Sequence, residues 1–507
     1  MKIKLIAPAK KAEWGESFWD LETFSRLTRK KAAGALLALP TLAALTPAGT
    51  EVVITDESVE PIDFSERVDL VGISFLTALA PRAYGIADIY RSKDVKVVLG
   101  GIHVSMLPEE AIEHADSVVI GEAEAVWPKV VSDFQAGSLK EYYYSECFPV
   151  LDSSPIPRWD LLDVDNYCYF TIQVGRGCPY SCDFCLVHVF NGRKYRHKSI
   201  DKVVEEIYFL KSIDRRKLLF FADDNLLAKP DFAAELMKAL EPLNIRFWAQ
   251  ASVNRLEDSE MLELLFKAGC RAVFVGFESV SEDSLDLVSK GAINKTDRYK
   301  IVIDKVHSAG IGVIGSFILG IDTDDEQIFV DTLSFIEENK IAFSMINVLT
   351  PFPGTMLYGT LLQEKRIANL DWSHYNAEHV CFEPKKMSCV QLLNGRNRLL
   401  SNLNSYKSLH KRLSCLWSKG AFVRHEEKTT RFTRGRFLFT LRSLFRPNPR
   451  ETLFILKSLW NQYMTSVSAV TLALNFHHYA SKLMAKKKKF TADEHLGSIH
   501  SKDIEVQ

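Results

Sequence analysis

Three cysteines on one short segment are the strongest chemical signal in the sequence. Cys178, Cys182 and Cys185 follow a C-x3-C-x2-C pattern in GRGCPYSCDFC, directly after a predicted strand at 171–174. Thiolates on one loop can bind an iron–sulfur cluster, and three of them leave one iron of a four-iron cluster without a protein ligand. Such an open iron offers a binding position to a substrate, as catalytic metal sites do. A zinc loop completed by His188 remains the alternative.

The first third of the chain alternates predicted strands and helices. Short apolar and β-branched runs predict strands at 3–7, 51–55, 70–74, 95–99 and 117–120, with helices at 84–92 and 108–114 among them. This alternation predicts a doubly wound parallel sheet, and ligands of such sheets lie beyond the carboxyl ends of the strands. The loops 74–81, 100–105 and 121–124 are therefore expected to line one crevice.

A second alternating series follows a polar, proline-marked linker at 152–160. Its strands are predicted at 171–174, 217–222, 246–251, 272–277, 312–319 and 344–348, with helices such as 199–211 and 231–239 between them. Six such units predict an open, partial βα barrel, since a closed barrel has eight. After about residue 370 the pattern becomes mainly helical, with one helix expected at 396–413. We expect domains at 1–150, 151–370 and 371–489, and a disordered tail at 490–507.

Composition limits the partners and the location of the protein. A formal net charge of -1 gives no reason to expect a nucleic-acid partner. Nine cysteines without regular spacing, and an N-terminus without a secretory signal, favour a reducing cytoplasm. Basic and apolar residues alternate at 432–460, which suggests peripheral contact with an anionic inner membrane and a lipid-like substrate. A helical face packed on the barrel is the alternative for this segment.

The cysteine loop, with Phe184 before its last cysteine, resembles that of the radical S-adenosylmethionine superfamily. The resemblance implies a [4Fe–4S] cluster whose free iron chelates S-adenosylmethionine. One electron, supplied by a donor such as flavodoxin or ferredoxin, then cleaves the sulfonium to a 5′-deoxyadenosyl radical. In the family pattern, one side chain of Asp223, Asp224 or Asn225 accepts the methionine ammonium. Glu278 lies near the ribose by the same resemblance, or is a salt-bridged barrel residue.

The segment after the fourth predicted strand resembles the cobalamin-binding domain that precedes the radical domain in one subgroup of this superfamily. The matching residues are Gly100, Gly101, His103, Pro108, Gly121, Glu122 and Glu124. Glycines allow a bulky ligand to approach the backbone closely. Ser74 and Thr77 could hydrogen-bond the amide side chains of cobalamin. His103 is expected at the ring periphery, or as a residue that only supports the helix near Pro108.

The first 150 residues contain no Asp-x-His-x-x-Gly motif for coordinating cobalt from below. Cobalamin is therefore expected to bind without a histidine ligand, although a domain that has kept the fold and lost the cofactor is the alternative. The resemblance implies a cobalamin-dependent methyltransferase that acts on an unactivated carbon of a small or lipid-like metabolite. A radical cyclase or rearrangement enzyme without methyl transfer is the enzymatic alternative. A zinc-stabilised binding protein without catalysis is the alternative from another class.

Overall fold

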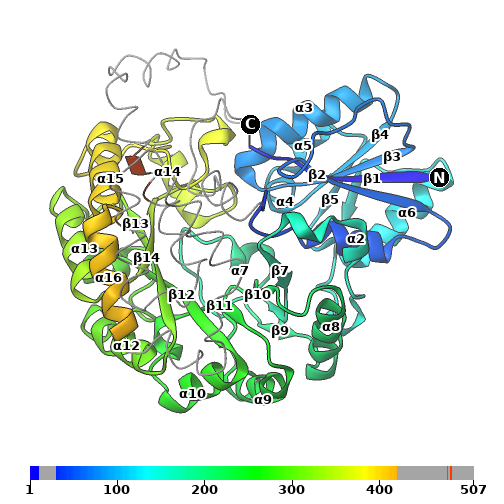
Figure 1. Ribbon diagram of the computed structural model, residues 1–507. Coiled ribbons are helices and arrows are strands. Elements are labelled where there is room, and N and C mark those ends of the chain that lie inside the picture. The colour runs from blue at the N-terminus through cyan, green and yellow to red at the C-terminus, as the bar shows by residue number, and fades with distance from the viewer. Residues whose placement is uncertain (11–29, 419–476, 478–479, 482–507) are drawn as a thin grey trace, which may run out of the picture.

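Two parallel six-stranded sheets lie next to each other in the computed structural model (Figure 1). The structure describes residues 1–10, 30–418, 477, 480 and 481. The first sheet has the order β2-β1-β3-β4-β5-β6 and the second has the order β14-β13-β12-β11-β10-β7. Both sheets and their parallel direction agree with the fold expected from the sequence.

The first sheet is covered by helices on both faces because successive residues of its strands point to opposite sides. Its strands are β1 (Lys2–Ala7), β2 (Glu51–Asp56), β3 (Leu70–Ser74), β4 (Lys96–Gly100), β5 (Ser117–Ile120) and β6 (Tyr142–Tyr144). Its helices are α2 (Ala38–Leu45), α3 (Ala80–Arg91), α4 (Ile102–Met106), α5 (Pro108–Glu113) and α6 (Trp127–Gln135). Ile6 packs in the core beneath α3, α4 and α5, whereas its neighbour Leu5 packs beneath α2 and α6 (Figure 1).

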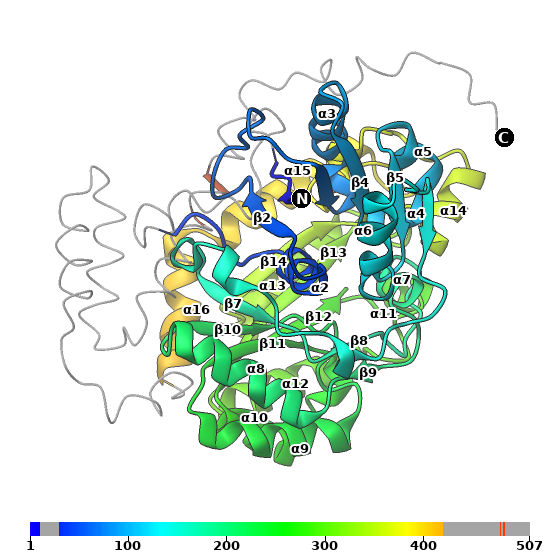
Figure 2. The same ribbon diagram turned by 90° about the vertical axis from the view of Figure 1, so that its right-hand side faces the viewer.

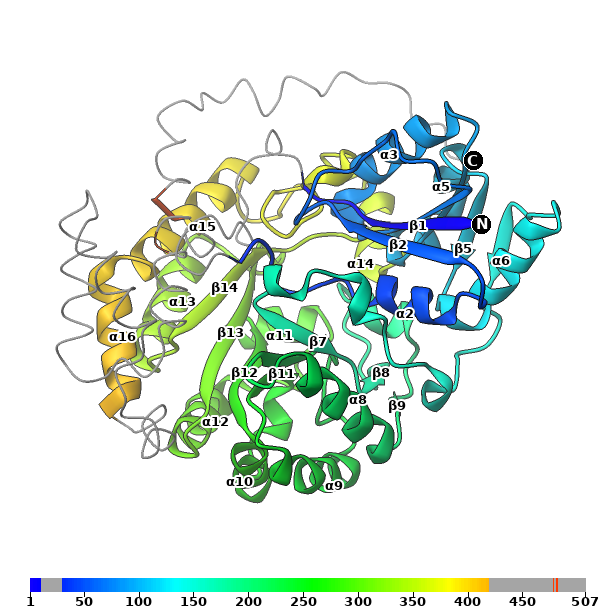
Figure 3. The same ribbon diagram turned by 45° about the vertical axis from the view of Figure 1, so that its right-hand side comes forward.

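The second sheet forms an open arc with helices on its outer side (Figure 3). Its strands are β7 (Tyr169–Ile172), β10 (Leu218–Phe221), β11 (Phe247–Ala251), β12 (Cys270–Glu278), β13 (Gly312–Leu319) and β14 (Phe343–Val348). The outer helices are α8 (Ile200–Ile213), α9 (Pro230–Leu240), α10 (Ser259–Ala268), α12 (Thr296–Ser308) and α13 (Gln327–Glu338). The predicted partial barrel of six strands is confirmed.

Short elements surround the end of the barrel where its strands terminate. They are α7 (Val187–Phe190), α11 (Glu282–Leu287), α14 (Met356–Gln363) and the antiparallel pair β8 (Gly175–Arg176) and β9 (Arg196–His197). Figure 2 shows this hairpin near α7, between the first sheet above and the barrel helices below. The hairpin encloses the cysteine-bearing segment.

Two helices, and not the single helix expected at 396–413, cover the outer edge of β14. They are α15 (Cys389–Leu403) and α16 (Tyr406–Ser418). The first helix ends at Asn404, whose side-chain amide donates to the carbonyl of Leu400 at 2.9 Å beside the backbone amide of the same residue. Arg396 donates to the β14 carbonyl of Ile346 at 2.8 Å. The basic segment 432–460 and the tail at 490–507 lie outside the described residues.

Two connecting segments differ in detail from the sequence-based expectations. The segment 152–160 joins the two sheets as a linker would, but it is anchored, because Trp159 is only 1% exposed and packs edge-on against Phe170 of the barrel core. The expected loop at 100–105 contains α4, a helix too short to give a clear periodic pattern. Among the helices that the structure describes, none is long and apolar enough to cross a membrane.

Candidate functional site

The cysteine loop lies beyond the carboxyl end of β7 and is closed at its base by the β8–β9 hairpin. The amide of Cys178 donates to the carbonyl of Gly192 at 3.2 Å, and the amide of Cys185 donates to the carbonyl of Cys182 at 3.0 Å. All three cysteines are free thiols; Cys182 is buried, and Cys178 and Cys185 are partly buried. Burial raises the pKa of Cys185 to about 12, and the nearby Lys290 ammonium opposes that rise. Binding to iron would supply the positive charge that these thiolates need.

Two segments from distant parts of the barrel hold the cysteine loop. The amide of Asp183 donates to the carbonyl of Val288 at 3.3 Å, and the amide of Leu357 donates to the carbonyl of Asp183 at 3.0 Å. In the described part of the chain, no three His, Cys, Asp or Glu side chains form a group that could hold one metal ion. The cysteines of a four-iron cluster each bind a different iron, so they do not converge on a single ion.

The three candidates after β10 have different surroundings. Asp223 is fully buried and accepts hydrogen bonds from the amides of Val174 at 3.0 Å and Gly175 at 2.5 Å, and from the Tyr195 hydroxyl at 2.9 Å. Burial raises the pKa of Asp223 to about 7. This carboxyl group therefore fixes the entrance to the cysteine loop, and its oxygens are already occupied.

Asn225 is also occupied, because its amide group donates to the Ser252 hydroxyl at 3.1 Å and accepts from the Ser252 amide at 3.3 Å. Asp224 has no side-chain hydrogen bond to another described residue and reaches the surface. Partial desolvation by the surrounding protein atoms raises the pKa of this carboxyl to about 6. Of the three candidates, only Asp224 has a carboxylate without a protein partner within the described residues.

Glu278 ends β12 in a backbone conformation that side chains rarely adopt, with φ at 65°. Such a conformation costs of order 1–3 kcal/mol and persists where the surrounding contacts impose it. Asn294 donates to the carbonyls of Gly276 and Phe277, which holds the turn. The Glu278 carboxylate lies 3.2 Å from the Lys290 ammonium. The salt-bridged alternative for Glu278 is thus present, and its contact with a ribose stays a prediction.

The three expected crevice loops lie side by side beyond β3, β4 and β5. The amide of Phe75 donates to the carbonyl of Gly100 at 3.3 Å. The Ser105 hydroxyl donates to the carbonyl of Gly101 at 2.9 Å and accepts from the amide of Gly121 at 2.9 Å. Gly101 has φ at 106°, and a Cβ there would lie 2.6 Å from the Phe75 carbonyl oxygen, so the close approach needs glycine.

The side chains predicted to contact cobalamin are mostly directed into the protein. His103 is fully buried, with its Nε2 3.1 Å from the Tyr84 hydroxyl and 3.3 Å from the Glu110 carboxylate. Because Glu110 belongs to α5, this geometry agrees with the alternative in which His103 supports the helix that begins at Pro108. Thr77 is buried and Ser74 is half-buried. Their contacts with a cofactor stay predictions.

Known proteins resemble this chain over both sheets. The Radical SAM superfamily model matches residues 172–336, and the B12 binding domain model matches residues 36–131. Bacteriochlorophyllide d C-12(1)-methyltransferase of Chlorobaculum tepidum is 32% identical over 70% of this chain and 78% of its own length. Bacteriochlorophyllide d C-8(2)-methyltransferase of the same organism is 34% identical over 68% of this chain and 80% of its own length. The chain belongs to the radical S-adenosylmethionine superfamily, in the group with a B12 binding domain.

A solved structure shares the fold of this radical S-adenosylmethionine enzyme. The cobalamin-dependent S-adenosylmethionine radical enzyme OxsB, with aqua-cobalamin and S-adenosylmethionine bound, superposes with a TM-score of 0.62 at 16% identity. The match covers 99% of this chain and 82% of that chain. The cofactors of the family are a [4Fe–4S] cluster, S-adenosylmethionine and cobalamin. Three free thiols on one loop, and the glycine-bearing loops beyond β3, β4 and β5, are suitable for the first and the last of these.

Three cationic residues of the site were missed by the sequence analysis. Lys290 lies beside the cysteines and pairs with Glu278, which raises the pKa of the Lys290 ammonium despite its burial. Arg176 and Arg196, on β8 and β9, pair with Glu122 of the B12 binding domain. No spacing rule connects residues that are 54 and 74 positions apart in sequence. The carboxylate of Glu122 already has protein partners, and its contact with cobalamin stays a prediction.

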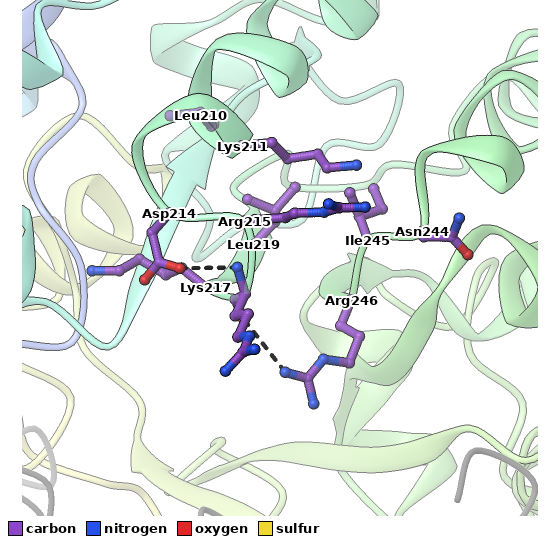
Figure 4. Close-up of a pocket in the computed structure, with 10 residues that line it drawn as sticks. Leu210, Lys211, Asp214, Arg215, Lys217, Leu219, Asn244, Ile245 and Arg246 are labelled. Carbon is purple, nitrogen blue, oxygen red and sulfur yellow. Dashed lines mark hydrogen bonds between the residues drawn. The ribbon is translucent and has the colours of Figure 1, made fainter. Parts of the chain in front are cut away.

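A basic pocket lies at the other end of the barrel strands (Figure 4). Lys211, Arg215 and Lys217 line it before β10, and Asn244 and Arg246 line it before β11. The cysteine loop and Asp224 instead follow the carboxyl ends of β7 and β10. The pocket is therefore not part of the radical S-adenosylmethionine site.

Proposed function

We propose that the enzyme methylates an unactivated carbon of a large, mostly apolar metabolite in the space between the cysteine loop and the cobalamin crevice. The observation that carries this proposal is the rim segment 351–358. Its Leu357 bonds to Asp183 inside the cysteine loop. Its Gly354, with φ at 87°, packs so closely on Met106 of α4 that a Cβ would lie 2.2 Å from the sulfur. One segment thus connects the surroundings of both cofactors.

The chain's own residues have distinct roles in this proposal. When bound, the cofactors supply a 5′-deoxyadenosyl radical and a methyl group. Cys178, Cys182 and Cys185 hold the cluster, and Asp224 accepts the ammonium of S-adenosylmethionine through its unpaired carboxylate. Lys290 keeps a positive charge beside the thiolates. Its pairing with Glu278 at 3.2 Å fixes where that charge lies.

Apolar side chains on the framing segments support an apolar substrate. Leu76, on the first crevice loop, is 58% exposed, and Met356, on the rim segment, is 69% exposed. Exposed apolar side chains on both segments would gain free energy if an apolar substrate covered them. The two similar Chlorobaculum proteins are named for bacteriochlorophyllide d, which makes that compound the first substrate to test.

The test is an anaerobic assay of the reconstituted enzyme with bacteriochlorophyllide d and other apolar metabolites. Isotope-labelled S-adenosylmethionine should transfer its methyl group to the product, and 5′-deoxyadenosine should form together with S-adenosylhomocysteine. A product without the labelled methyl group would instead support the cyclase or rearrangement alternative. Transfer of the labelled methyl group by a protein that retains no cobalamin would exclude cobalamin chemistry.

An electron donor such as flavodoxin or ferredoxin is part of the proposal. The cysteine loop reaches the surface at Pro179 and Ser181, both of which are exposed, and this supports electron entry there.

We also propose that the cytoplasmic enzyme contacts an anionic inner membrane through 432–460, which lies outside the described residues. Flotation with anionic liposomes tests this contact, and absence of salt-sensitive binding would contradict it.

A further inference from the structure

Four charged residues join the B12 binding domain to the base of the cysteine loop. We call Glu122, Glu124, Arg176 and Arg196 the interdomain ion cluster. Arg176 donates to the Glu122 carboxylate at 2.7 Å and also pairs with Glu124. Arg196 binds both oxygens of Glu122, one of them at 3.3 Å. A single carboxylate thus receives two guanidinium groups from the other domain.

The interdomain ion cluster is shielded from water. The side chain of Glu122 is 1% exposed, and those of its two arginine partners are 16–17% exposed. Burial opposes the ionisation of Glu124, but Arg176 lowers the pKa of that carboxyl overall. Buried charges are tolerated only when they are paired and hydrogen-bonded. Removing one member of the cluster would leave its partners as unpaired buried charges and would destabilise the protein. The cluster is therefore a specific contact and not a solvated surface pair.

Additional contacts hold both arginines in place before they reach Glu122. Arg176 donates to the Gln173 side chain at 2.8 Å. Arg196 donates to the carbonyl of Pro149 at 3.2 Å, and its guanidinium lies 4.4 Å from the centre of the Phe148 ring. Planar guanidinium groups bind carboxylates with defined directions. The contacts therefore fix both the distance and the orientation between the two domains.

The cluster connects residues that adjoin both predicted cofactor sites. Glu122 follows Gly121, whose amide is bonded to Ser105 of the neighbouring crevice loop. Arg176 precedes Cys178 by two residues, and its neighbour Gly175 is held by Asp223. A shift at Glu122 would thus move the crevice relative to the cysteine loop.

We propose that Glu122 is a positioning residue that sets the placement of the cobalamin crevice relative to the cysteine loop. This inference rests on the proposed function, in which a methyl group and a radical must reach the same carbon. A misplacement of about 1 Å can cost about 100-fold in rate. Direct binding of cobalamin by the Glu122 side chain is the competing role, but both of its oxygens already have partners.

The experiment compares Glu122→Gln with a matched control, Glu57→Gln. Glu57 pairs with Arg82 within the same domain, and both side chains are 17% exposed. In cofactor-free protein, Glu122→Gln should speed hydrogen exchange by about tenfold in peptides containing Gly121, Gly175 and Cys178, because the contact between domains is weakened. Glu57→Gln should leave these peptides unchanged.

With cofactors loaded, Glu122→Gln should lower methylated product per 5′-deoxyadenosine by about tenfold or more. Bound iron, retained cobalamin and 5′-deoxyadenosine formation should remain near the wild-type values. Arg196→Lys keeps the charge and loses the planar fork, so its product ratio should be intermediate. This variant also keeps the inference testable if Glu122→Gln does not fold.

Each alternative result has a defined meaning. Loss of cobalamin with unchanged hydrogen exchange would assign Glu122 to direct cofactor binding and overturn the inference. An equal fall in product and 5′-deoxyadenosine, or the same effects in Glu57→Gln, would reduce Glu122 to a general structural residue. If the wild-type enzyme makes no methylated product, the proposed function fails. The exchange comparison in cofactor-free protein still decides whether Glu122 couples the domains.

Discussion

The cysteine loop and the cobalamin crevice use their polar side chains in opposite ways. In the cysteine loop the thiols are free, while neighbours such as Asp223 hold the backbone. In the crevice, the side chains of His103 and Glu122 are already bonded within the protein, and glycines form the close contacts between loops. A cofactor bound through covalent ligands thus leaves its ligands visible in the sequence. A cofactor bound by shape leaves mainly small residues.

The largest expected effect comes from removing a cluster ligand. Replacing Cys178, Cys182 or Cys185 with Ala should remove most bound iron and abolish 5′-deoxyadenosine formation, because the thiolates are the protein ligands of the cluster. Iron analysis and an anaerobic cleavage assay measure both quantities. Cys270→Ala is the control, since Cys270 is buried in β12 away from the loop. If a variant with all three cysteines replaced by Ala still cleaved S-adenosylmethionine, the assignment of these cysteines as cluster ligands would be refuted.

A second prediction separates the acidic candidates after β10. Asp224→Asn should raise the KM for S-adenosylmethionine by about 10-fold to 100-fold, since a charge-assisted hydrogen bond is worth about 1.5–3 kcal/mol. The iron content should not change, because Asp224 holds no part of the loop. Asn225→Asp is the matched comparison, and its occupied side chain should affect stability more than KM. An unchanged KM in Asp224→Asn would show that another group accepts the ammonium of S-adenosylmethionine.

Asp223 is expected to make the stability of the folded protein depend on pH. Its folded-state pKa is about 7, raised by burial from a reference value of 3.8. The folded protein therefore holds this proton more tightly than the unfolded chain. The stability that the group contributes is fully present below the unfolded pKa and is lost as pH rises through about 7.

Urea unfolding of the cofactor-free protein across this pH range measures the effect. Asp223→Asn should flatten the pH dependence, because the amide does not titrate. The exposed Glu235→Gln, on α9, is the control and should keep the wild-type slope. A wild-type slope in Asp223→Asn would show that other groups cause the pH dependence.

Much of the fold was predictable because strand patterns are local. β3, β5 and β13 have the predicted limits, since each is a short and mostly apolar run. β6 was missed because three tyrosines give too short a pattern. The cysteines were visible through their spacing. Lys290, Arg176 and Arg196 were not, because their partners are brought together only by the tertiary fold.

The smallest expected effect concerns His103. Cobalt should have no nitrogen ligand from the protein, because His103 is fully buried and its Nε2 contacts Tyr84 and Glu110. Reconstituted protein reduced to cobalt(II) should therefore give an EPR spectrum without nitrogen superhyperfine splitting. His103→Gln should retain stoichiometric corrin through gel filtration, although loss of the buried contacts should reduce stability by about 1–3 kcal/mol. Tyr84→Phe, which removes one partner of His103 and keeps the ring, should retain corrin equally. Splitting in the wild type that disappears in His103→Gln would place this residue on the metal, and the crevice would then resemble the cysteine loop in using a side-chain ligand.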